Sequence, residues 1–129
     1  MSGIADIRRH VHELIAASTE LPVLRWLPEA PNELPCYVVG RPNETEDSSR
    51  RSTKLIEVPV YALGRTLRDD TAQDELDAMA DHLDDLLWKP PQEPGRTMRL
   101  TALRATVTVI ANIEIPAYTA TVATATAPC

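Results

Sequence analysis

The chain has 129 residues, of which 43% are hydrophobic and 25% are charged, and its formal net charge at pH 7 is −6. This length predicts a single domain, residues 1–129, that buries on the order of two-thirds of its surface. The negative charge argues against general or sequence-specific nucleic-acid binding, because neutralising phosphates needs a basic field. No stretch approaches the ~20 apolar residues of a membrane span, so we expect no membrane contact.

The first residues also lack the apolar run of a signal peptide. The two cysteines, Cys36 and Cys129, do not indicate a disulfide framework. Both observations fit synthesis in the cytoplasm.

The N-terminal third is predicted to hold one helix and one short strand. Residues 4–17 form the helix, because Ile7, Val11 and Ile15 gather on one face at a spacing of four. Prolines between residues 22 and 35 exclude a continuous helix or a central strand there, and we expect Trp26 to anchor this irregular segment on the core. Residues 36–39, which end at Gly40, predict the strand.

Residues 41–53 contain no apolar residue, which predicts a solvated hairpin loop. A loop of this length is uncommon unless it is functional or disordered. Two interpretations stay open: a loop that becomes ordered against a partner, or a mobile hairpin tip. In the first interpretation the charged contact residues are Arg41, Glu44, Glu46, Asp47, Arg50, Arg51 and Lys54.

The middle of the chain predicts a strand over residues 55–63 and a helix over residues 70–88. Asp70 is a suitable N-cap, and Pro90 prevents the helix from continuing far past Trp88. On a helical wheel the aspartates cluster on the side opposite the leucines. They are Asp70, Asp74, Asp77, Asp81, Asp84 and Asp85.

This acidic side has three interpretations. Like charges three or four residues apart destabilise a helix, so a positive partner surface would relieve the repulsion. An interface between subunits would then use Asp70, Asp74, Asp77, Asp81 and Asp85 together with arginines such as Arg96 and Arg99. The second interpretation is a solvated face that keeps the protein soluble. A calcium site at Asp77 and Asp81 is the least favoured, because a helix cannot wrap an ion as a loop does.

The C-terminal third predicts two long strands, residues 97–112 and 113–124, rich in β-branched side chains. The alternation of apolar residues changes parity near Ala102, which predicts a β-bulge. Residues 119–129, a tail of threonine and alanine, form either ordered strand or a flexible extension.

Residues 56–61 and 113–118 resemble each other, as IEVPVY and IEIPAY. The similarity indicates either an internal duplication or a chance match between two strand-like hexamers. Both contain a proline, Pro59 and Pro116, which cannot donate to a β-ladder. Each proline is therefore expected at a sheet edge or a bulge, and open edges are places where subunits join.

The residues that usually perform catalysis form no recognisable pattern here. His10 and His12 lie two positions apart, so a helix points them in different directions, and His82 lies on the flank of the acidic side. The glycines stand singly, so they build no phosphate loop. We expect no catalytic residue, metal or cofactor; an enzyme would need an acid–base pair drawn from His10, His82 and the aspartates.

The predicted order is α-β-β-α-β-β. It indicates an α+β fold with a mainly antiparallel sheet and two helices packed on one face. With its N-terminal amphipathic helix, proline-rich approach to residues 36–40, polar hairpin, strand-to-helix passage over residues 58–88 and two Thr/Val strands, the chain resembles the tail terminator (tail completion) proteins of long-tailed bacteriophages.

The resemblance implies a structural virion protein of the phage tail. Such a protein closes into a homo-oligomeric ring, expected to be a hexamer, that caps the tail tube and joins it to the head. The implied partners are other copies of the chain, the tail tube protein and the head–tail connector protein. The alternative function is a small cytosolic α+β domain that binds a ligand or regulates another protein.

Overall fold

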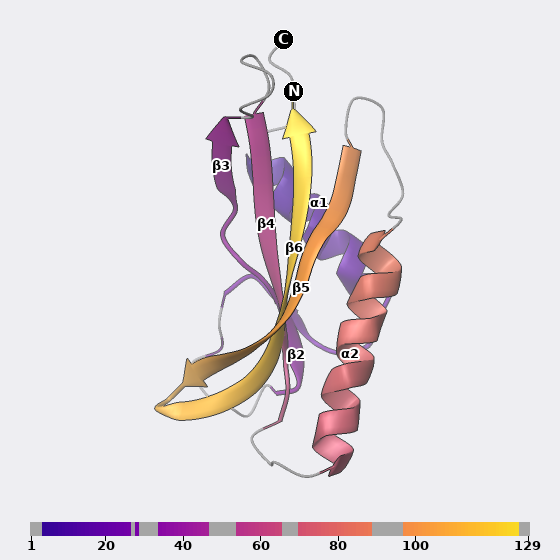
Figure 1. The fold of residues 1–129 in the computed structure, drawn as a ribbon, viewed down its shortest axis with the longest axis vertical. Helices are drawn as coiled ribbons and strands as arrows, with labels where there is room; N and C mark the ends of the chain where they lie inside the picture. The colour runs from indigo at the N-terminus through magenta and orange to yellow at the C-terminus, as the bar shows by residue number, and fades with distance from the viewer. Residues whose placement is uncertain are drawn as a thin grey trace.

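The structure is a computed structural model that describes residues 4–26, 28, 34–46, 54–65, 70–88 and 97–126. Two helices and a mixed β-sheet make it an α+β protein (Figure 1). In chain order the elements are α1 (Ile4–Ala16), β1 (Val23–Leu24), β2 (Cys36–Val39), β3 (Asn43–Glu46), β4 (Lys54–Leu63), α2 (Asp70–Trp88), β5 (Thr97–Ile110) and β6 (Ile113–Thr126). The predicted order omitted β1 and β3 and was wrong at both places.

The strands of the sheet follow the order β1-β2-β4-β6-β5, and β3 pairs with β4 beside this path. β1 runs parallel to β2, whereas the other four pairings are antiparallel. β6 therefore lies inside the sheet, and β5 forms one of its edges. Among the described residues no helix has the length and apolarity needed to cross a bilayer.

The main core joins both helices to alternate residues of the sheet, as the apolar periodicity predicted. Ile7, Val11 and Ile15 of α1 have no exposed surface. They belong to one cluster with residues of α2, β2, β4 and β6. The cluster members from these elements are Leu76, Met79, Leu83, Leu87, Tyr37, Val39, Ile56, Val58, Val60, Ala62, Ala120 and Val122.

A second, smaller core lies where the β5–β6 hairpin bends across the sheet. Ile110, Ile115 and Ala117 of the hairpin are buried against residues of β2 and the end of β4. Figure 1 shows this end of the hairpin curving away from α2. The hairpin thus has one apolar side that is packed and one side that faces outward.

Part of the predicted loop 41–53 is in fact a strand, β3. Its four polar residues pair with β4, from Asn43↔Glu57 to Glu46↔Lys54. Hydrogen bonding along the ladder therefore determines this segment, without help from apolar side chains. Residues 47–53 lie outside the described part of the chain.

Pro59 lies in β4, an interior strand, so the expectation of a sheet edge was wrong for it. On the side of β4 that faces β2 and β3, residues 40–42 oppose residues 58–59, between the pairs Val39↔Val60 and Asn43↔Glu57, so the ladder is interrupted at Pro59. The partner segment thus holds one extra residue at the place where proline cannot donate. Pro116 pairs with Val107 of β5, just beyond the last β4–β6 pair, Leu63↔Ala117.

The two C-terminal strands were predicted closely. The expected bulge is present as a register shift between Leu100 and Ala102. β5 ends at Ile110, because Ala111 and Asn112 form a two-residue turn with positive φ angles of 52° and 64°, as in a type I′ hairpin. β6 continues to Thr126, so residues 119–126 are strand, and residues 127–129 lie outside the described part.

Candidate functional site

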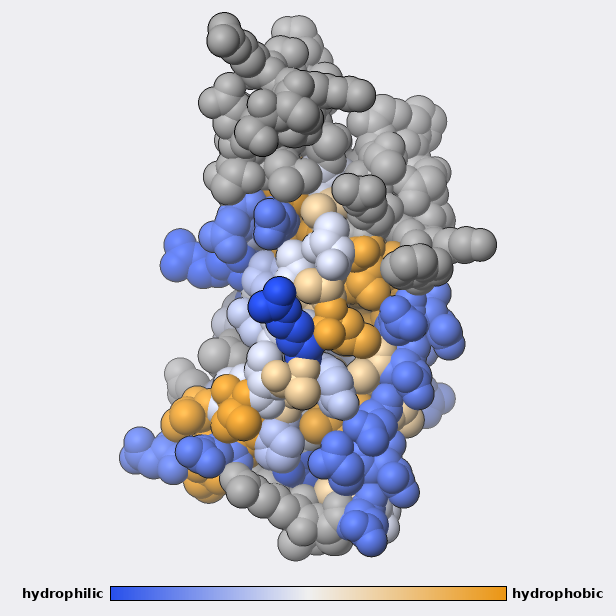
Figure 2. All heavy atoms as spheres, in the orientation of Figure 1, coloured by the Kyte–Doolittle hydropathy of each residue, from blue (hydrophilic) through white to orange (hydrophobic). Residues whose placement is uncertain are grey.

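The aspartates of α2 form an acidic face that is open to solvent. Asp70, Asp74, Asp81, Asp84 and Asp85 are all exposed. The helix contains no lysine or arginine, and Figure 2 shows hydrophilic side chains gathered along it. These carboxylates repel one another, and those near the C-terminus of the helix also oppose the macrodipole. The exposed aspartates therefore offer a negative surface whose repulsion a cationic partner would lower.

Asp77 differs from these exposed aspartates, because it accepts hydrogen bonds from other residues of the same chain. Its Oδ1 accepts hydrogen bonds from the hydroxyl of Tyr118 at 3.1 Å and from the amide Nε2 of Gln73 at 3.1 Å. The bond from Tyr118 is the main cause of a raised pKa of that phenol, and partial burial and the charges of Asp77 and Asp81 add to it. Asp77 therefore ties α2 to β6, a contact that no sequence pattern indicated.

The contact of the aspartates with Arg96 and Arg99 across a subunit interface stays a prediction, because the described part of the chain does not test it. Arg96 lies outside that part. Arg99 belongs to β5, and only its backbone is described. The described ion pair of α2 is a different one: Arg65 Nε lies 2.8 Å from Glu75 Oε1. It joins the end of β4 to the first half of the helix.

The predicted partner-binding residues of the loop are only partly described. Arg41 is exposed directly after β2. Glu44 and Glu46 lie in β3, and Lys54 opens β4 opposite Glu46. The side chains of these three, and all of Asp47, Arg50 and Arg51, lie outside the described residues.

Trp26 was expected on the core, and that prediction was wrong: 71% of its surface is exposed. The segment that carries it is nevertheless held firmly. The Nε2 of His12 donates to the carbonyl of Val23 at 2.9 Å, and the guanidinium of Arg8 donates to the carbonyl of Arg25. In addition, the N–H of Tyr37 donates to the carbonyl of Pro22 at 2.9 Å. A large aromatic side chain is thus exposed on a segment that hydrogen bonds hold in place.

The outward side of the β5–β6 hairpin is apolar. Val107 is 62% exposed and Val109 61%, whereas Ile113, 41% exposed, pairs with buried Ile110 and lies on the inner side. A hydrophobic patch is visible at this end of the hairpin in Figure 2. Exposed apolar side chains are ordinary when scattered, but a contiguous group is typical of an interaction site.

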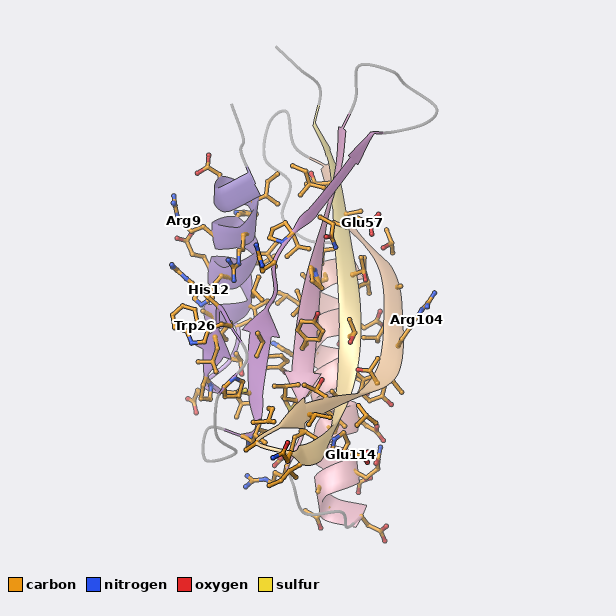
Figure 3. The ribbon with its side chains drawn as sticks, turned by 90° about the vertical axis from the view of Figure 1, so that its left-hand side faces the viewer. Arg9, His12, Trp26, Glu57, Arg104 and Glu114 are labelled. Atoms are coloured by element: carbon orange, nitrogen blue, oxygen red, sulfur yellow. The ribbon has the colours of Figure 1, made fainter. Side chains whose placement is uncertain are left out.

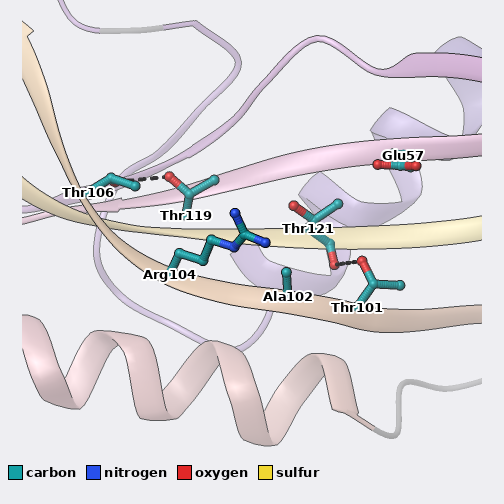
Figure 4. Close-up of a pocket in the computed structure, with 7 residues that line it drawn as sticks. All are labelled: Glu57, Thr101, Ala102, Arg104, Thr106, Thr119 and Thr121. Atoms are coloured by element: carbon teal, nitrogen blue, oxygen red, sulfur yellow. Dashed lines mark hydrogen bonds between the residues drawn. The ribbon is translucent and has the colours of Figure 1, made fainter.

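The face of the sheet turned away from α2 carries a polar hollow of about 400 Å³, which the sequence did not predict (Figure 4). Its charged side chains are Glu57 and Arg104. Threonines line most of the rest; the hydroxyls of Thr106 and Thr119 lie 3.0 Å apart. Register brings these residues together from three strands. Threonines at alternate positions of residues 101–121 were the available signal.

His82 of α2 contacts a serine hydroxyl at the end of α1. Its Nε2 lies 2.9 Å from Ser18 Oγ, and that hydroxyl donates to the carbonyl of Ile15 at 2.7 Å. The hydroxyl proton is therefore directed to the end of α1, and His82 acts as the donor. Within the described ranges no group of three or more His, Cys, Asp or Glu could hold a metal ion.

No protein-family model matches this chain, and no curated protein matches it.

Proposed function

We propose that this chain is a structural virion protein, a tail terminator that closes into a ring, caps the tail tube of a long-tailed phage and joins it to the head. The mechanism is assembly through complementary surfaces. The layout of the sequence supports the proposal, since it resembles that protein class over nearly the whole chain.

The surfaces of the protomer also support assembly. The main core holds both α1 and α2, and the long edge strand β5 is left for contacts. No described strand pairs with the outer side of β5, and such an edge is a template for pairing with another chain. The acidic face of α2 is a further, charged surface available for contact with another chain.

One observation carries the proposal: the β5–β6 hairpin bends out of the sheet with Val107 and Val109 more than half exposed. Leaving two such side chains in water forfeits about 1.5–3 kcal/mol each relative to burial. Contact with a second chain recovers that free energy. A hairpin with a fixed turn and an apolar outer side suits a subunit contact.

Size-exclusion chromatography with light scattering tests the proposal. The protein is measured alone and with purified tail tube protein. We expect a discrete oligomer in at least one of the two samples, together with co-elution with the tube. A monomer in both samples at every concentration, with no co-elution, would overturn the proposal.

The polar hollow favours a second candidate function, the binding of a small polar ligand. Glu57 and Arg104 present opposite charges across a floor of threonine hydroxyls, an arrangement that suits a zwitterion. Saturable binding of an amino-acid-like metabolite, lost in Arg104→Ala and retained in Arg9→Ala, would support this function. A monomeric protein that binds in this way would favour it over the ring.

A further inference from the structure

We propose that neighbouring protomers join through two different surfaces: Trp26 of one copy packs on Val107 and Val109 of the next. The assignment rests on the proposed ring and names the residues that make its contacts. It concerns binding of the chain to a second copy of itself.

The two surfaces are separate within one protomer. Trp26 lies beside α1, whereas the end of the hairpin, marked by Glu114, lies apart from it (Figure 3). Both surfaces are open to solvent in the protomer, since Trp26 is 71% exposed and the two valines are 62% and 61% exposed. Neither surface therefore covers the other in the isolated chain. Together with Ile113 they are the large hydrophobic residues described as exposed.

Trp26 has the properties of an interface anchor. Tryptophan is enriched among the residues that carry most of the binding energy in protein interfaces. The hydrogen bonds from His12 and Arg8 fix the carbonyls of Val23 and Arg25 on either side of it in sequence. Because this segment is ordered before contact, docking the indole loses little backbone entropy.

The hairpin presents a suitable receiving surface. Its inner side is held by Ile110 and Ile115 in the second core, so the outer side is presented by a supported structure. Val107 pairs with Pro116 across the hairpin, and proline adds apolar surface beside the valine. An indole ring placed there meets Val107, Val109 and Pro116, beside the exposed Glu114 that pairs with Val109.

The charges around the two surfaces are complementary. Arg25 is exposed next to Trp26 and forms no ion pair with any described residue, whereas Arg9 on the same side is paired with Asp6 at 3.5 Å. The hairpin end lies at the same end of the molecule as the start of α2 (Figure 1), where Asp70 and Asp74 are exposed. Charge therefore orients the cationic Trp26 surface toward the acidic end of the next copy.

Two unlike surfaces on one chain make a heterologous contact, and heterologous contacts produce rings when the rotation between copies closes. A hairpin that met its own copy would instead give a two-fold dimer. The pairing of Trp26 with the valines is thus heterologous, as a contact within a ring must be.

Disulfide trapping tests the assignment even if the contact is weak. In a Cys129→Ser background, with buried Cys36 retained, one protein carries Trp26→Cys and a second, larger tagged protein carries Val109→Cys. The two are mixed with and without tail tube protein and oxidised. The control pair combines Trp26→Cys with Arg104→Cys, whose side chain projects from the opposite side of the sheet in Figure 3.

We expect the Trp26→Cys and Val109→Cys pair to give on the order of tenfold more mixed dimer than the control pair, since an interface holds the two thiols together. A single chain with both substitutions should give a ladder of cross-linked oligomers that reduction abolishes. A yield equal to the control, or a dominant dimer of two Val109→Cys chains, would overturn the assignment. Melting curves of each variant establish that it is folded.

Capping of tubes by the wild-type protein, measured in parallel samples, separates the two claims. If the tubes are capped but the mixed dimer does not form, the assignment of surfaces is wrong and the proposed function stands. If the mixed dimer forms but the tubes are unaffected, the contact is real and the proposed function fails.

Discussion

Gly64 donates its backbone N–H to the carbonyl oxygen of Pro116 at 2.9 Å and thereby holds the end of β4 against β6. The sheet repeats this arrangement, because Gly40 donates to the carbonyl of Pro59 at 2.8 Å at the end of β2. In each case a proline that cannot donate still accepts, and a glycine supplies the donor. The two prolines occupy matching positions in the similar hexamers, so the sequence similarity corresponds to a repeated contact.

Gly40→Ala should destabilise the protein by about 1–3 kcal/mol, the usual cost of overpacking. An added Cβ would lie 2.9 Å from Pro59 Cγ and 3.0 Å from Tyr61 Cε2, both in a well-packed strand. Urea unfolding measures the change. Gly64→Ala is the matched control and should cost less, because its closest contact would be 3.2 Å from Pro116 O. Equal stability of Gly40→Ala and wild type would refute the close approach.

Ala111→Gly should stabilise the protein by about 0.5–1 kcal/mol, because glycine adopts the left-handed region without the penalty that a Cβ carries. Ala111 has a φ of 52° in the hairpin turn. Thermal unfolding measures the shift. The same change at Ala78, an exposed position of α2, should have the opposite sign and cost about 1 kcal/mol. A destabilised Ala111→Gly would mean that the turn is not of this type.

Thr124→Val should raise the free energy of unfolding by about 1 kcal/mol, since the substitution removes a buried polar atom that has no partner. Thr124 is 2% exposed and its Oγ1 has no hydrogen bond in the structure. Chemical denaturation provides the measurement. Thr119→Val serves for comparison, because it loses the 3.0 Å bond to Thr106 and should give no gain. If both changes had the same effect, the hydroxyl of Thr124 would have a partner.

Stability should fall between about pH 10 and pH 12. Burial raises the pKa of Tyr37 from 10.0 to about 12. In that range the folded chain keeps the phenol proton while the unfolded chain releases it, so rising pH favours unfolding. The contribution of this group is complete below pH 10 and is lost as the pH passes the folded pKa. Denaturation midpoints across this range should show the slope, and Tyr37→Phe should reduce it; an unchanged slope would assign it to other groups.

Periodic patterns predicted much of the fold. The spacing of Ile7, Val11 and Ile15 was sufficient for α1, and the change of parity was sufficient for the bulge near Ala102. β3 was missed because its sequence, NETE, contains no apolar residue. The strand forms through backbone pairing with β4 alone. β1 was missed because two residues between prolines and Trp26 show no alternation.

The candidate surfaces were harder to predict. Trp26 was misplaced because aromatic residues are usually buried, and only the contacts of Arg8 and His12 reveal a segment held outside the core. The bond between Asp77 and Tyr118 joins residues far apart in the chain, and helix periodicity cannot show it. Five aspartates of α2, Asp70, Asp74, Asp81, Asp84 and Asp85, were in contrast placed correctly on the exposed side by their spacing.

Electron microscopy of tail tubes assembled with this protein tests the central claim most directly. Tail tube protein is polymerised with wild-type chain or with the Val107→Asp/Val109→Asp variant, which keeps the inner side of the hairpin intact. We expect a ring of density at one end of each wild-type tube and shorter tubes than without the protein, and neither effect with the variant. Tubes that grow to the same length with bare ends in the presence of folded wild-type protein would contradict it.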